Sequence, residues 1–177
     1  MTLADLLVSS AVLGLTLSAT LTLLQQGQRA WDVGAARVEA QEGGRAALAW
    51  LAAELRTAGQ GPGPRRVATL TVAEPTRVAL RVDRNRDGVI AGATEEITWR
   101  LAGDVLRRDA GGGAQPVVNA VQALSLTYFD GAGAPTTEPA AVRRIAITLV
   151  TRAERARALP ARGLTAVYST DVHLRNQ

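Results

Sequence analysis

Oxygen-bearing side chains alternate along residues 83–88, which read Asp-Arg-Asn-Arg-Asp-Gly. Such spacing, closed by a glycine that permits a sharp turn, matches the first half of a calcium-binding loop. Asp83, Asn85 and Asp87 would supply side-chain oxygens. Val89 would supply a backbone carbonyl at the seventh position of the loop. Hard oxygen ligands of this kind favour Ca²⁺ over a transition metal.

The far end of this segment departs from an EF-hand. The twelfth position is Thr94, and two acidic residues follow it at Glu95 and Glu96. The flanking residues alternate as strands do, and are not helical in pattern. Two interpretations therefore stay open: a strand-loop-strand calcium site that includes these two glutamates, or a long hairpin loop whose Asp and Asn side chains form Asx turns. Arg84 and Arg86 would point outward and would lower the affinity for calcium.

The most basic stretch of the chain is residues 143–162. It holds six arginines against one acidic residue, Glu154, for a local charge of +5. It is either a solvated loop edge or a contact surface for an acidic partner, including DNA phosphates. Because no aromatic residue is interleaved, a stacking platform for single strands is disfavoured. The six are Arg143, Arg144, Arg152, Arg155, Arg157 and Arg162.

Catalytic chemistry finds little support in the chain. His173 is the only histidine, and strand alternation places it on a solvent-facing position. Cysteine is absent, which excludes disulfides and thiolate metal sites, and neither a Gly-x-Ser-x-Gly elbow nor a phosphate loop occurs. Glu95 and Glu96 would point to opposite faces of a strand, which does not suit a general acid–base pair. We therefore expect no enzyme and no required cofactor.

Strands are expected to position most of these residues, because apolar residues recur at every second position in the chain after Pro64. Gly103-Asp104 is typical of a tight hairpin turn between two of the strands. The three tryptophans are expected on the helix and in the core. Apolar residues alternate with polar ones in five stretches, at 78–82, 97–101, 124–128, 145–149 and 166–174.

A helix is expected to precede the strands and to end near Ala58. Its second half carries an apolar stripe from Ala47 to Ala58, and we place Glu54 and Arg56 on the opposite side. Helix-weakening positions occur at Gly27, Gly34 and the pair Gly43-Gly44. The run from Gly59 to Pro64 is a strong stop signal. The sequence thus predicts an α+β fold in which an antiparallel sheet buries the stripe.

The first residues of this helix are long and apolar enough to cross a bilayer. From Leu6 to Leu24 there are 19 residues without a charge, a run about 28 Å long against a hydrocarbon core of roughly 30 Å. Asp5 is the only charged side chain before Arg29. Thr2 and Asp5 also have the spacing of a capping box, which offers a local role for this acid.

The segment Met1-Thr2-Leu3-Ala4-Asp5-Leu6-Leu7-Val8 resembles the mature N-terminus of type IV pilins and pseudopilins. That pattern has an acid at the fifth position, usually Glu, ahead of an apolar helix. Residues 45–59 are similar to the end of the long helix in PilW-type minor pilins and in the related J-type minor pseudopilins. The order of helix and strands agrees with that group over nearly the whole length.

This resemblance implies a domain organisation, a processing step and a cellular location. Residues 1–28 would form a transmembrane or filament-core helix, residues 29–59 its amphipathic continuation, and residues 60–177 a globular antiparallel β head. Met1 would be the residue that a prepilin peptidase exposes and methylates. Asp5 would compensate a charge in the apolar filament core, that of the N-terminal amine of an adjacent subunit. The head would lie in the periplasm until the subunit left the inner membrane for the pilus tip.

The resemblance also implies partners: other minor pilins, the major pilin, the inner-membrane assembly platform, and lipid before assembly. The expected function is a structural minor pilin that primes pilus assembly. A J-type minor pseudopilin of a type II secretion system is the alternative within the class. A DNA-capturing pilus-tip subunit and a membrane-anchored binding module remain as alternatives from other classes. The net charge of +4, carried by arginine without any lysine, permits acidic partners without requiring nucleic acid.

Overall fold

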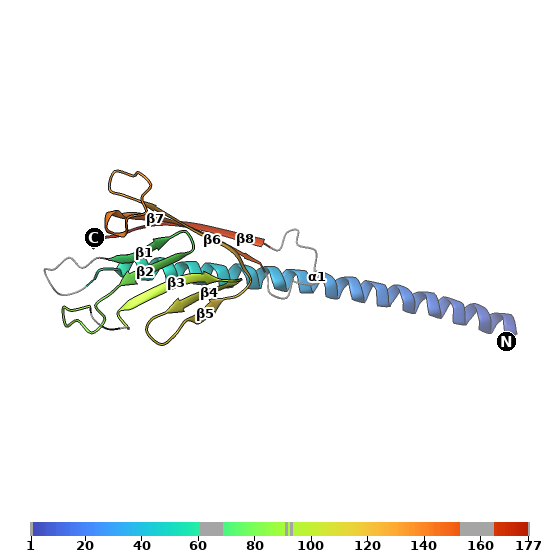
Figure 1. The fold of residues 1–177 in the computed structure, drawn as a ribbon. Helices are drawn as coiled ribbons and strands as arrows, with labels where there is room; N and C mark the ends of the chain where they lie inside the picture. Colours follow the sequence, from blue (N-terminus) through green and yellow to red (C-terminus); the bar gives the residue numbers. More distant parts are fainter. Residues whose placement is uncertain (1, 61–68, 91, 93, 153–164, 177) are drawn as a thin grey trace.

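The computed structural model describes residues 2–60, 69–90, 92, 94–152 and 165–176. Within them one long helix precedes the strands, which form two antiparallel sheets (Figure 1). The expected α+β fold is confirmed. In chain order the elements are α1 (Leu3–Thr57), β1 (Leu70–Glu74), β2 (Arg77–Arg81), β3 (Glu96–Ala102), β4 (Val105–Asp109), β5 (Gln115–Val118), β6 (Val121–Phe129), the 3₁₀ turn η1 (Pro139–Ala141), β7 (Arg144–Arg152) and β8 (Thr165–His173).

Helix α1 begins and ends where local chemistry favours it. Thr2 is the N-cap, and its side chain and that of Asp5 complete a reciprocal capping box. At the other end Gly59 adopts a φ of +71°, a left-handed conformation that suits glycine. The helix is unbroken over its 55 residues, including all the glycines at which weakness was expected.

The strands pair in the order β1-β2-β3-β4-β5 in one sheet and β6-β7-β8 in the other. The predicted hairpin turn at Gly103-Asp104 joins β3 to β4. A second sheet was not predicted. The chain changes sheets at Asn119-Ala120, where Ala120 has a φ of +54° and its carbonyl accepts a hydrogen bond from the Arg152 amide at 2.9 Å.

The core lies between the C-terminal half of α1 and the inner faces of both sheets. The predicted helix stripe is buried in full, at Ala47, Leu48, Leu51, Ala52, Leu55 and Ala58. Trp99 of β3 and Ile147 of β7 are among the largest side chains packed against this stripe's cluster. The N-terminal half of α1 stands clear of the strands, and the two termini lie at opposite ends of the molecule (Figure 1).

Gly44 lets α1 approach the three-stranded sheet closely. A Cβ at this position would lie 2.7 Å from Tyr168 Cε2 and 2.9 Å from Thr151 Oγ1. The Tyr168 hydroxyl also donates a hydrogen bond to the Gln41 carbonyl of α1 at 2.8 Å. Tertiary packing therefore holds the helix intact at Gly44, a residue that would weaken an isolated helix. The close contact requires that this position carry no side chain.

We expect Gly44→Ala to lower the free energy of unfolding by about 1–3 kcal/mol, because the added methyl overpacks a tight contact. Gly43→Ala is the matched control: its Cβ would lie 3.4 Å from Val118 Cγ2, an ordinary contact. That variant should be neutral or up to about 1 kcal/mol more stable through helix propensity. Chemical unfolding of the full chain in detergent measures both. Equal effects of the two substitutions would contradict this account.

Tyr128 of β6 ties the two sheets together. Its side chain is buried, and its hydroxyl donates to the carbonyls of Glu74 at 2.7 Å and Arg77 at 3.2 Å. Burial, and secondarily the charge of Glu74, raises the pKa of Tyr128 above its usual 10.0. The link thus depends on a neutral phenol.

Stability should fall as the pH rises above about 10, because the unfolded chain then releases a phenol proton that the folded chain keeps. The chain has neither lysine nor cysteine, so no amine or thiol side chain adds to this dependence. The wild-type slope should approach about 1.4 kcal/mol per pH unit. Tyr128→Phe should flatten that slope and cost about 1–2 kcal/mol at neutral pH.

Candidate functional site

Most of the exposed large apolar side chains among the described residues lie on the N-terminal part of α1. Its large apolar side chains are exposed from Leu3 to Leu24, with Leu3 at 82% and Leu15 at 72%. Nothing in the described part of the head covers the apolar window, and α1 is long and apolar enough to span a membrane. A surface of this kind needs lipid or other helices around it, because exposed apolar area of this extent is unfavourable in water.

Asp5 lies at the free end of this apolar helix. Its Oδ2 accepts the Thr2 backbone amide at 2.8 Å, and its own amide donates to Thr2 Oγ1 at 3.3 Å. The local capping role expected from the sequence is therefore present. Met1, the expected processing and methylation site, lies outside the described residues. The carboxylate has a local partner but no cation within 4.0 Å in the described chain.

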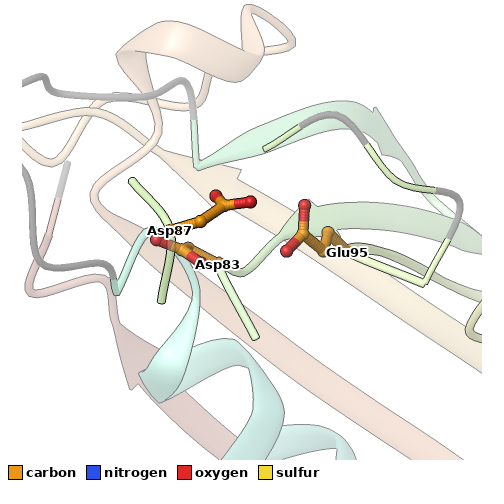
Figure 2. A group of neighbouring side chains, drawn as sticks. All are labelled: Asp83, Asp87 and Glu95. Atoms are coloured by element: carbon orange, nitrogen blue, oxygen red, sulfur yellow. The ribbon is translucent and has the colours of Figure 1, made fainter. Parts of the chain in front are cut away.

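The loop between β2 and β3 brings three carboxylates together. One oxygen from each of Asp83, Asp87 and Glu95 lies within 4.8 Å of the others (Figure 2). Asp83 and Glu95 are buried, at 7% and 4% exposure, whereas Asp87 is exposed. Hard carboxylate oxygens at this spacing suit a divalent cation such as Ca²⁺.

Hydrogen bonds inside the loop follow the Asx-turn interpretation. Asp83 accepts the amides of Arg86 at 2.7 Å and Gly88 at 2.9 Å. Asp87 accepts the Val89 amide at 2.7 Å and the Asn85 side-chain amide at 2.7 Å. Arg86 adopts a φ of +61°, which is uncommon for a residue other than glycine. The acidic side chains of the loop thus hold its backbone through Asx-type hydrogen bonds. One geometry therefore accommodates both the Asx-turn loop and a calcium site.

The other expected calcium ligands are placed differently. The Asn85 side-chain amide donates to Asp87 Oδ2 at 2.7 Å. Glu96 lies on the opposite face of β3 from Glu95, where it contacts Arg81 at 3.8 Å and Thr71 at 3.4 Å. The alternation of a strand accounts for this separation, because successive side chains point to opposite faces. Of the four expected carboxylate ligands, the cluster therefore contains three, Asp83, Asp87 and Glu95.

The cluster of Asp83, Asp87 and Glu95 lies beside the C-terminal end of α1 (Figure 2). The Asp83 amide donates to the Gln60 carbonyl at 3.3 Å, and the Gly59 amide donates to the Arg81 carbonyl at 2.8 Å. The C-terminal end of a helix carries partial negative charge, which adds to that of the three acids. A cation here would be stabilised by both, and would connect the end of the helix to the β2–β3 loop.

A shallow cavity of about 450 Å³ lies on the outer face of the five-stranded sheet. Cross-strand pairing brings Arg81 beside Glu96, and Thr98 beside Asp109, on its floor. The lining is polar, and none of its residues is aromatic or a nucleophilic cysteine. This geometry does not assemble a catalytic group.

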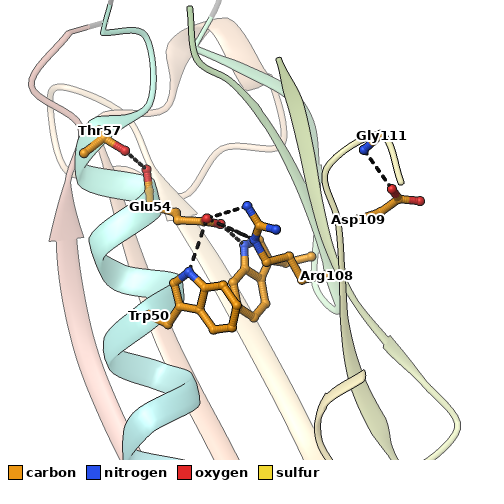
Figure 3. Close-up of polar contacts among 7 residues, drawn as sticks. Trp50, Glu54, Thr57, Arg108, Asp109 and Gly111 are labelled. Carbon is orange, nitrogen blue, oxygen red and sulfur yellow. Dashed lines mark hydrogen bonds and ion pairs between the residues drawn. The ribbon is translucent and has the colours of Figure 1, made fainter. Parts of the chain in front are cut away.

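A partly buried polar cluster that the sequence did not predict joins α1 to the five-stranded sheet. Glu54 forms an ion pair with Arg108, whose Nη2 lies 2.7 Å from Oε1 (Figure 3), and accepts a hydrogen bond from Trp99 Nε1 at 2.7 Å. The rings of Trp50 and Trp99 meet edge to face with centroids 5.5 Å apart. Placing Glu54 on the solvent side was therefore wrong, while Arg56 is exposed as expected. The sequence feature that could have indicated this pairing is Arg108. It lies two residues after the buried Leu106 in β4, so its side chain is on the same, core-facing side of the strand.

Strand β7 separates the arginines of the basic stretch. Arg144 and Arg152 lie at its two ends, about 26 Å apart at the usual strand rise. Arg144 pairs with Asp171 at 3.1 Å and stacks over Phe129 at 3.8 Å. Arg143 donates to the carbonyls of Ala140 and Val142. Glu154, Arg155, Arg157 and Arg162 lie outside the described residues.

His173, the only histidine, is exposed at the end of β8, as the alternation predicted. It lies opposite Arg144 in the strand pairing. The described residues place no second catalytic candidate beside it.

Comparisons with known proteins leave the family open. A scan against protein-family models finds no match, and no curated protein matches the chain.

Proposed function

We propose that this chain is a structural minor pilin of the PilW type that joins a type IV pilus at its tip and primes its assembly. The observation that carries the proposal is the exposed apolar half of α1, which projects from a folded head and ends in Asp5. Lipid covers this helix in the inner membrane, and neighbouring helices cover it in the filament. The subunit acts by assembly and not by catalysis.

Two further features support a membrane-held precursor. Trp31 is 77% exposed and follows Arg29 just after the apolar run. Tryptophan is enriched at membrane–water interfaces, where one part of the ring is apolar and the other wet. From Leu6 to Trp31 the helix is about 37 Å long, close to a bilayer that includes part of its headgroup region. The part of α1 that packs against the head then begins near Ala36, the first buried residue of the helix.

Mass spectrometry of the native N-terminus, in cells with and without prepilin peptidase, tests the proposal. A methylated chain that starts at Met1 only when the peptidase is present would support the pilin class. An unprocessed, unmethylated start would overturn it and leave a membrane-anchored binding module. A J-type minor pseudopilin gives the same processing, and copurification with type II secretion subunits instead of pilus subunits distinguishes it. Salt-sensitive DNA binding lost in Arg152→Ala would identify a DNA-capturing tip subunit.

We further propose that Asp83, Asp87 and Glu95 hold a structural Ca²⁺ ion. The convergence of the three carboxylates near the negative end of α1 favours it. The ion would neutralise buried negative charge and fasten the β2–β3 loop to the helix end. No other cofactor is required for the assembly role.

Calcium should raise the unfolding free energy of the wild-type chain by about 1.4–2.7 kcal/mol at 10–100 times its dissociation constant. Asp83→Asn should abolish this increment, whichever way it alters the starting stability. Glu96→Gln is the matched control and should keep the increment, since Glu96 lies on the other face of β3. Thermal unfolding with Ca²⁺, Mg²⁺ or chelator measures it. An equal response to Mg²⁺, or none to either ion, would argue against a calcium site.

A further inference from the structure

Three arginines lie in a row across the outer face of the five-stranded sheet. The strand register sets Arg77 of β2 opposite Arg100 of β3, and Arg100 opposite Arg107 of β4. The Cβ atoms of residues that face each other in this way are about 5 Å apart. Arg77 and Arg100 are exposed, and Arg107 is half-buried. We refer to these three residues as the arginine row.

The positive charges of the arginine row are not paired within the described part of the chain. None of the three guanidinium groups lies within 4.0 Å of a carboxylate oxygen there. Glu74 lies opposite Arg77 at the end of the row without forming such a pair. Arg107 instead donates to the Ala114 carbonyl at 3.1 Å. Because like charges directly opposite one another destabilise a sheet, this arrangement favours binding of an anion.

Acidic residues limit where such an anion can bind on this face. The cross-strand pair next to the arginine row is Thr98 with Asp109, and beyond it Arg81 pairs with Glu96 at 3.8 Å. Both acids and Arg81 line the shallow cavity described above, which therefore has a net negative charge. An extended anion is thus confined to the arginine row. It runs across the strands from Arg77 toward β5, which carries no charged side chain.

The other side chains of this face distinguish between classes of polyanion. The outward positions of β2, β3 and β4 hold no aromatic residue on which the bases of a single strand could stack. They also expose no large apolar side chain of the kind that anchors a protein–protein interface. Double-stranded DNA needs neither, because its outer phosphates support binding through charge alone. The row spans about 10 Å, the length of about three phosphates of one strand along the helix axis.

We infer that the arginine row binds the phosphate backbone of double-stranded DNA without reading its sequence. Each guanidinium can donate two parallel hydrogen bonds to a phosphate, and the bound phosphates remove the repulsion among the three arginines. This inference goes beyond the proposed function and does not depend on it, since it concerns the head alone. It also differs from a DNA contact through the basic stretch, whose described arginines lie in β7 or directly before it.

Fluorescence anisotropy with a short labelled DNA duplex tests the inference on the full chain in non-ionic detergent. Three phosphate contacts predict that the affinity falls about fortyfold between 50 and 200 mM salt. Arg100→Ala should reduce this fall to about twelvefold, because one contact fewer releases fewer counterions. Arg100→Lys keeps the positive charge and should keep the fortyfold fall. Arg100→Ala also relieves like-charge repulsion in the row, so the variant should remain folded.

Arg81→Ala is the matched control for Arg100→Ala. It removes the same charge from the same face, but Arg81 is already paired with Glu96 and lies outside the arginine row. The salt dependence of this variant should therefore equal that of the wild type. Arg152→Ala, on the other sheet, should also leave the salt dependence unchanged.

Equal reductions in Arg100→Ala and Arg81→Ala would show that DNA responds only to overall charge, and would overturn the inference. Absence of duplex binding at low salt would overturn it as well, and would leave the pilin proposal standing. Tighter binding to polyglutamate than to the duplex would overturn it in favour of an acidic protein partner. Failure of N-terminal processing would overturn the pilin proposal without changing the outcome of the DNA measurement.

Discussion

Asp5→Ala is expected to remove the chain from filaments while leaving it folded and membrane-bound. In the proposed assembly the Asp5 carboxylate faces the N-terminal amine of a neighbour inside an apolar core. Loss of one partner leaves the other charge buried alone, which costs about 3–5 kcal/mol and corresponds to more than a hundredfold in the assembly equilibrium. The ratio of sheared-filament to membrane-fraction protein, measured by immunoblot, reports this loss.

Asp5→Asn separates the two roles of this residue. Its amide oxygen can still accept the Thr2 amide, as Oδ2 does at 2.8 Å, so the local cap is kept while the charge is lost. If the charge acts between subunits, Asn should fail nearly as badly as Ala and Asp5→Glu should assemble. Near-normal filaments with Asn would show that Asp5 serves only as a helix cap, which is worth about 1 kcal/mol.

Glu54→Ala should be the most damaging single substitution in the head among the polar positions. It leaves the Arg108 guanidinium and the Trp99 indole N–H without their shared acceptor, in a cluster where both charged side chains are only 15% exposed. Breaking a largely buried pair by removing one partner costs about 3 kcal/mol. The unfolding midpoint of the full chain in detergent should fall by roughly 10 °C.

The matched control for Glu54 is Asp171→Ala. Asp171 also pairs with an arginine, at 3.1 Å from Arg144, but its side chain is 57% exposed. Solvent screening should hold that loss to under about 1 kcal/mol. Equal losses in the two variants would mean that the Glu54 cluster does not fasten the helix to the sheet.

The sequence predicted the helix and most strands because the patterns that mark them extend over only a few neighbouring residues. The apolar run, the stripe from Ala47 to Ala58 and the two-residue alternation are each determined by neighbours within a few positions of the chain. The acidic loop was recognisable for the same reason, as its spacing lies within one short segment. Alternation also placed Glu95 and Glu96 on opposite faces, whereas the calcium interpretation included both, and Glu96 lies outside the carboxylate cluster.

Contacts between distant segments were decided by the tertiary structure alone. The pairing of Glu54 with Arg108 and the close approach of Gly44 to Thr151 each join residues more than 50 positions apart. The strands pair in chain order, but local alternation does not show where one sheet ends and the next begins. Sequence alone determined a long helix, apolar at its start, followed by antiparallel strands, because periodicity encodes which side of an element is buried. Only the folded chain decided which buried sides meet, since that choice depends on shape and hydrogen-bond partners that no local pattern specifies.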